Sequence, residues 1–157
     1  MQLLNRAAGF TSNIQDLKSV YLTYVRSVLE QSAAVWHSSL SSKNKKDLER
    51  VQKAAVRVIL QGKYKSYKKG LKTLNIQTLE NRRESLCLKF AKNCLKNEKV
   101  KNFFPKSETK HCMKKRKQRK FKINQVKTQR YKKSAIPYMQ SLLNKENNMK
   151  RKTMNNC

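Results

Sequence analysis

Two aspartates, Asp16 and Asp47, are the first residues to consider for chemistry, because enzymes that make or cut phosphodiester bonds gather carboxylates around divalent metal ions. Each aspartate lies in a stretch with helical spacing and has lysines nearby in the sequence. Nothing in the sequence resembles a paired-carboxylate turn with metal-binding geometry. We therefore interpret both as ordinary surface charges and assign no catalytic residue.

Cysteine and histidine suggest a zinc site, in which His111 and Cys112 would join Cys87 and Cys94. Their spacing matches no common zinc module. Cys87 and Cys94 are seven residues apart on one side of an expected helix, so we expect both to be buried thiols. His37 has no partner that the sequence can name, and no glycine-rich phosphate loop is present. We expect neither a metal nor a cofactor in this chain.

Aromatic residues interleaved with lysines form a stronger signal in the segment KYKSYKK, residues 63–69. Rings in such a pattern stack on bases while ammonium groups contact phosphates. A partly packed loop on a solvated basic face explains the same pattern equally well. The candidate nucleic-acid contacts of the whole chain are Arg50, Lys53, Arg57, Lys63, Lys65, Lys68, Lys69, Lys114, Lys115, Arg116, Lys117, Arg119, Lys120 and Lys122, with Tyr64 and Tyr67 for base stacking.

The charge balance points to a polyanionic partner. Lys and Arg number 38 against 9 Asp and Glu, a net charge of +29, and the excess is greatest beyond residue 100. Such an excess repels itself, so nucleic acid is the first candidate partner and an anionic membrane surface the second. The run KKRKQRKFK, residues 114–122, fits a nuclear import signal, a phosphate clamp or a solvated tail. Lysine–phosphate contacts would make the binding sequence-independent.

A helix over Asp47–Gly62 is the element around which the rest is organised. Its apolar residues recur at three- and four-residue steps, and Gly62 suits a left-handed C-terminal cap. Three lysines lie just before this stretch, in the first turn of the same helix, where the helix dipole disfavours cations. They are kept there either for another reason or for none. The apolar stripe is Leu48, Val51, Ala55, Val58 and Ile59, and the first-turn lysines are Lys43, Lys45 and Lys46.

Two further helices are expected, over residues 13–39 and 79–95. The first has Ile14, Leu17, Tyr21, Tyr24, Val28 and Val35 in one row, with Trp36 in the core. The second begins after Thr78 as N-cap. Its stripe is Leu79, Leu86, Phe90 and Cys94, with Arg82 and Arg83 facing outward.

These elements predict an all-α protein. The low counts of Gly (3) and Pro (2) disfavour the frequent tight turns of an all-β sandwich, and 38% hydrophobic residues is below the usual share of a fully globular chain. We expect a small helical bundle, a long antiparallel helix pair plus a third helix, with a basic and mostly flexible C-terminal tail. The expected divisions are a leader over 1–12, a helical domain over 13–100, a basic flexible tail over 101–133 and a short amphipathic segment over 134–157 that becomes loose after residue 143.

Nothing in the sequence predicts a secretory or membrane route. The first ten residues lack the apolar core of a signal peptide, and no run is long enough to span a membrane. The 4 cysteines include no pair at CxxC spacing. We expect an intracellular protein with reduced thiols, with no membrane partner, and nuclear if residues 114–122 act as an import signal.

Three blocks occur in order along the chain, LKSVYLTYVRSVLEQSAAVWHSSL, DLERVQKAAVRVIL and LKTLNIQTLENRRESLCLKFAKNCLKN, and RYKKSAIPYMQSLLN follows them. The three blocks resemble the region that follows the polymerase core in non-LTR, LINE-type (jockey-like) retrotransposon reverse transcriptases, and the last segment resembles the C-termini of such reading frames. The matching positions are Tyr24, Val25, Arg26, Val28, Leu29, Glu30, Trp36, Leu48 to Gln52, Ala55, Arg57, Ile59, Leu79, Glu80, Arg82 and Arg83.

The resemblance implies a thumb-like helical region with a basic tail that helps its parent enzyme to grip template and primer. Ser27 replaces the family's frequent proline, and Gln31 replaces an aromatic residue. The endonuclease and the palm, with its divalent metal such as Mg²⁺, would lie upstream of Met1, so the chain alone is not expected to polymerise. Two alternatives stay open, an independent basic RNA- or DNA-binding structural protein and a subunit that completes a polymerase in trans.

Overall fold

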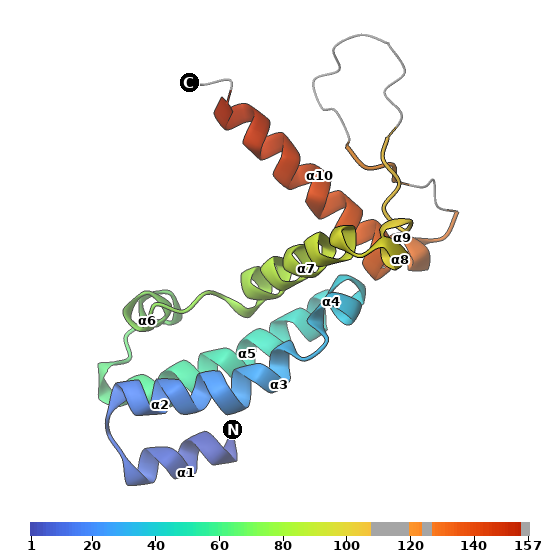
Figure 1. Ribbon diagram of the computed structural model, residues 1–157. Coiled ribbons are helices and arrows are strands. Elements are labelled where there is room, and N and C mark those ends of the chain that lie inside the picture. The colour runs from blue at the N-terminus through green and yellow to red at the C-terminus, as the bar shows by residue number, and fades with distance from the viewer. Residues whose placement is uncertain (108–119, 124–126, 155–157) are drawn as a thin grey trace. The chain divides into compact units, whose positions relative to one another are not determined.

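The computed structural model describes residues 1–107, 120–123 and 127–154, and within these ranges the regular structure is helical apart from one isolated bridge between Lys106 and Phe121. The all-α prediction is confirmed. The elements (Figure 1) are α1 (Gln2–Phe10), α2 (Ile14–Val20), the π-helix η1 (Tyr21–Arg26), α3 (Ser27–Glu30), α4 (Ala33–Trp36), the 3₁₀-helix η2 (His37–Ser39), α5 (Ser42–Leu60), the 3₁₀-helix η3 (Gln61–Lys63), α6 (Tyr67–Leu74), α7 (Leu79–Lys96), α8 (Glu98–Lys101), α9 (Gln129–Lys132) and α10 (Ala135–Met154).

Packing divides the chain into two compact units. Unit 1 comprises Met1–Ala33 and Leu40–Glu84, and unit 2 comprises Ala34–Ser39 and Ser85–Cys157. The boundaries expected at residues 12, 100 and 133 follow composition rather than packing, and they remain predictions.

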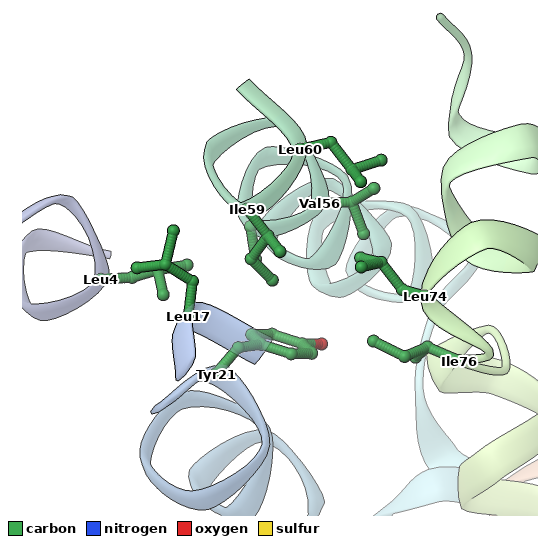
Figure 2. Packing of buried hydrophobic residues seen from close by; sticks show 9 residues of the cluster. Leu4, Leu17, Tyr21, Val56, Ile59, Leu60, Leu74 and Ile76 are labelled. Carbon is green, nitrogen blue, oxygen red and sulfur yellow. The ribbon is translucent and has the colours of Figure 1, made fainter. Parts of the chain in front are cut away.

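The core of unit 1 lies where α1, α2 and α5 run side by side, with α2 and α5 antiparallel as expected (Figure 1). Leu4, Leu17 and Tyr21 are fully buried and point toward Ile59 and Val56 of α5 (Figure 2). Each fully buried apolar side chain of this size contributes about 1.5–3 kcal/mol. Leu74 and Ile76, at the end of α6 and just after it, close the cluster.

The prediction of a single helix over residues 13–39 is wrong for the second half of that range. The helical run ends at Glu30, and Ser32 takes a left-handed φ of 52° before α4 begins. The expected buried row stops at Tyr21, because the side chains of Tyr24, Val28 and Val35 are 60%, 68% and 66% exposed. Trp36, expected in the core, is half-buried.

The prediction of which residues of α5 are buried is also partly wrong. Ala55 and Ile59 are buried as expected, but the rest of the buried face consists of Gln52, Val56 and Leu60. A helix with α2 on one side and α6 on the other must bury a wider face than a single stripe. At the C-terminal end the left-handed φ of 45° belongs to Gln61, not to the expected Gly62.

The buried face of α7 follows four-residue steps. Leu79, Arg83, Cys87 and Ala91 are fully buried, whereas Phe90 is 48% exposed. The expectation that Arg83 faces outward is therefore wrong. The expected N-cap is confirmed, because the Thr78 hydroxyl accepts from the Asn81 amide at 3.3 Å.

Unit 2 has its own core, to which α7 and α10 contribute. Phe104, Phe121, Met139 and Leu143 are buried together with Ala91. A mostly flexible tail was expected over residues 101–133, but Phe104 and Phe121 are buried in this core, because burying an aromatic ring removes a large apolar surface from water. The last helix, α10, continues to Met154, so the expectation that the chain is loose after residue 143 is wrong.

Three charged side chains form an ion-pair network in unit 1. The Arg82 Nε donates to both carboxylate oxygens of Glu30, at 3.2 and 3.3 Å. The Arg26 Nε lies 3.5 Å from the same carboxylate. Because the Glu30 side chain is largely shielded from solvent, this network fixes the start of α7 against α3 more firmly than an exposed pair would.

Gly70 allows a close approach of α6 to α5. A Cβ atom there would lie 2.6 Å from Cγ1 of Val56 and 3.1 Å from Cδ1 of Leu60. Gly70→Ala is expected to lower the free energy of unfolding by about 1 kcal/mol, because overpacking against a stiff valine outweighs the gain in helix propensity. Gly9→Ala in α1 is the matched control, since a Cβ there meets nothing within 4 Å. It should stabilise by about 0.5–1 kcal/mol. Urea unfolding measures both, and a stabilising Gly70→Ala would contradict the close packing.

Candidate nucleic-acid interface

Five exposed cations follow one face of α5, at steps of three and four residues, and we call this set the α5 stripe. Its members are Lys43, Lys46, Arg50, Lys53 and Arg57. At 1.5 Å per residue the stripe is about 21 Å long. A continuous helix fixes the spacing of these cations before any partner arrives, so binding would order only their side chains.

The sequence predicted three members of this stripe, Arg50, Lys53 and Arg57, and missed Lys43 and Lys46 as members of the site. The steps from 43 to 46 and from 46 to 50 carry the same helical period, so the signal was present on the polar face. Lys45, the remaining lysine of the first turn, has a different role, because its Nζ donates to Glu80 at 3.1 Å within unit 1.

An acidic residue borders the α5 stripe. Asp47 accepts from Arg50 at 3.1 Å, and the two side chains are 44% and 80% exposed. A pair this exposed contributes about 0–1 kcal/mol, so Arg50 exchanges Asp47 for a phosphate at little cost. Asp16, the other aspartate, lies exposed in the first turn of α2.

The two tyrosines proposed for base stacking both pack against the core of unit 1. The Tyr64 ring has the Arg57 guanidinium over it, at 5.4 Å from the ring centroid. The Tyr67 hydroxyl donates to Glu49, and burial, followed by this hydrogen bond, raises the pKa of Tyr67 above its ordinary value. This arrangement matches the alternative of a partly packed loop, and base stacking stays a prediction.

The remaining predicted lysines of unit 1 lie on η3, on the connection to α6 and on α6 itself. Lys63, Lys65, Lys68 and Lys69 are all exposed. The packing of Gly70 on Val56 and Leu60 sets α6 against α5, so these four lysines and the α5 stripe belong to one folded unit.

Part of the predicted basic run lies outside the described residues, namely Lys114, Lys115, Arg116, Lys117 and Arg119. The structure places the last two members in unit 2, where Lys120 and Lys122 are exposed on either side of the buried Phe121.

Metal-ligating residues show no clustering in the part of the chain that the structure describes, where no three His, Cys, Asp or Glu side chains could share an ion. Cys87 is buried as expected, whereas Cys94 is half-buried and packs against the unit 2 core, and burial raises the pKa of Cys94. His111 and Cys112 lie outside the described residues. His37 is buried and its ring meets the Tyr138 ring edge-on, with centroids 5.6 Å apart.

Comparison with known proteins adds no relative to this picture. No family model, no curated protein and no solved structure matches the chain. Among the helices of the described ranges, none is long and apolar enough to cross a membrane.

Proposed function

We propose that the chain binds RNA or DNA without sequence preference, through the α5 stripe and the lysines of the α6 region. The observation that carries this proposal is the α5 stripe itself, five exposed cations at helical spacing on a folded unit. Their partners would be phosphates, because ammonium and guanidinium groups on a rigid helix match a regular array of negative charges.

Sequence independence follows from the chemistry of the α5 stripe. The stripe consists of exposed lysines and arginines, and contacts from such cations to phosphates carry no sequence information. Lysines dominate it, and they contact phosphate as point charges. The nearby tyrosines are engaged with Arg57 and Glu49.

We further propose that the chain is the thumb-like part of a non-LTR reverse transcriptase, which grips template and primer beside the polymerase palm. The resembling blocks supply the helices α3, α5 and α7, and three of their motif residues, Arg26, Glu30 and Arg82, converge on one ion-pair network. Residues 114–122 would direct such a protein to the nucleus. The polymerase activity and its Mg²⁺ belong to the parent enzyme in this proposal.

The test is the salt dependence of binding, measured by fluorescence anisotropy with 20-base-pair duplexes of RNA and of DNA of random sequence. About six phosphate contacts predict a loss of affinity of about 10³-fold between 50 and 200 mM salt. Shuffling the probe sequence should leave the affinity unchanged. An affinity that does not change with salt concentration, or that requires one particular probe sequence, would overturn the proposal. Incorporation of dNTPs by these 157 residues alone would overturn the assignment as the thumb-like part.

A further inference from the structure

Two buried amide side chains on α10 form hydrogen bonds with the backbone of two other segments of unit 2. Gln140 and Asn144 are one helical turn apart and only 2% and 5% exposed. The Gln140 Nε2 donates to the Phe103 carbonyl at 2.8 Å. The Asn144 Nδ2 donates to the Phe121 carbonyl at 3.0 Å, while its Oδ1 accepts from the Phe121 amide at 2.9 Å. We call these two residues the amide clamp.

The amide clamp holds both chain segments of an antiparallel bridge, in which Lys106 pairs with Phe121. The Ser107 amide donates to the Lys120 carbonyl, and the Lys122 amide donates to the Pro105 carbonyl, both at 2.9 Å. An isolated bridge of this size is marginal by itself in water. Its stability therefore depends on the amide clamp and on the burial of Phe121.

The bridge carries three exposed lysines, Lys106, Lys120 and Lys122. Lys106 is paired with Phe121 in the bridge, and Lys120 and Lys122 are the immediate sequence neighbours of Phe121. The Lys120 Nζ lies 5.9 Å from the centroid of the Phe121 ring, which keeps its aliphatic stem close to the bridge. These cations are thus attached to backbone that is already ordered, and contacting a phosphate would not require that backbone to lose further conformational entropy.

We propose that Lys106, Lys120 and Lys122 form a second phosphate-contacting element, separate from the α5 stripe, and that Asn144 is its positioning residue. The inference rests on the proposed function in taking a nucleic acid as the partner. Asn144 touches no phosphate itself. It acts by fixing the Phe121 backbone, and with it the two lysines on either side.

The first test replaces the lysines. Lys106→Gln, Lys120→Gln and Lys122→Gln are combined in the full chain, at positions where all three side chains are exposed. The salt slope of binding to the random-sequence duplexes should become shallower by about 2.7, and the affinity at 0.1 M salt should fall a few hundredfold. A change in slope below about 0.5 would overturn the element.

The second test addresses Asn144. Asn144→Leu keeps the number and branching of the side-chain heavy atoms, removes both hydrogen bonds to Phe121 and should weaken binding about tenfold. Asn148→Leu, one turn further along α10, is the matched control and should leave binding unchanged. If Asn144→Leu lowers the helical circular-dichroism signal, Asn144→Ser takes its place and should show the same loss of affinity.

A double-mutant cycle separates positioning from general destabilisation. In the background of the three glutamines, Asn144→Leu should have no further effect on affinity, because the lysines it positions are already gone. In the background of the α5 variant Lys43→Gln, Lys46→Gln and Lys53→Gln, its effect should be undiminished. Equal effects in both backgrounds would overturn the positioning role. If the unsubstituted chain binds and depends on the α5 stripe but not on the bridge lysines, the inference fails while the proposed function stands.

Discussion

Replacing Lys43, Lys46 and Lys53 together with glutamine is expected to weaken nucleic-acid binding a few hundredfold at 0.1 M salt. Each lost phosphate contact makes the slope of log affinity against log salt shallower by about 0.9, so three contacts predict a change of about 2.7. Arg50 and Arg57 are left in place, because Arg50 pairs with Asp47 and Arg57 covers Tyr64. Anisotropy titrations at several salt concentrations measure both the slope and the affinity.

The matched control removes the same charge elsewhere. Lys89, Lys96 and Lys99 are exposed on α7 and α8, and their replacement by glutamine lowers the net charge equally. The change in salt slope should be less than half of that in the α5 variant. Both variants should keep the thermal midpoint of the unsubstituted chain, since substitutions at exposed positions usually change stability by less than about 0.5 kcal/mol. Equal losses of affinity in the two variants would show that net charge, rather than the α5 stripe, governs binding.

Replacing Gln52 with leucine is expected to lower the free energy of unfolding by about 2–3 kcal/mol. Gln52 is fully buried; its Oε1 accepts from the Tyr21 hydroxyl at 3.0 Å and its Nε2 donates to the Gln77 carbonyl at 2.8 Å. Leucine is close to glutamine in volume, so the main cost is the Tyr21 hydroxyl left in the core without its acceptor. Burial already raises the pKa of Tyr21, which shows how poorly its surroundings would accommodate a phenolate.

A double-mutant cycle with Tyr21→Phe sharpens this prediction. Replacing both partners by apolar groups of similar shape removes the unsatisfied hydroxyl, so the double variant should be more stable than the sum of the single changes by at least about 1 kcal/mol. Urea unfolding followed by circular dichroism gives the four stabilities. Gln15→Leu, at an exposed position of α2, is the control and should change stability by less than about 0.5 kcal/mol. A Gln52→Leu chain as stable as the unsubstituted one would contradict the buried network.

The buried Gln52 also explains why the buried face of α5 was only partly predicted from the sequence. Apolar periodicity counts hydrophobic residues and assigns glutamine to the surface. A polar side chain is buried at low cost when its hydrogen bonds are met, and here the partners come from Tyr21, 31 residues away, and from Gln77. No local pattern contains that information. Arg83 of α7, fully buried and expected to face outward, is a second residue of this kind.

The candidate interface likewise includes residues that the sequence predicted and residues whose roles depend on tertiary packing. Helical spacing and charge, both local properties, were enough to predict Arg50, Lys53 and Arg57 as exposed cations on one helix. Lys45 and Lys46 are neighbours of the same type in the sequence, yet Lys45 pairs with Glu80 and Lys46 is exposed on the α5 stripe. Their roles differ because a rotation of about 100° per residue turns adjacent side chains toward different neighbours.

The sequence by itself determined that this protein is helical, where α2 and α7 begin and where α5 and α7 end to within about two residues, and that it carries a large positive charge. These follow from periodicity, capping residues and composition, which act over a few residues. The tertiary structure decided which polar residues enter the core and that Phe121, within a basic run, is buried and bound by Asn144. Such pairings join residues far apart in the chain, and their free energy comes from contacts that exist only once the helices have packed.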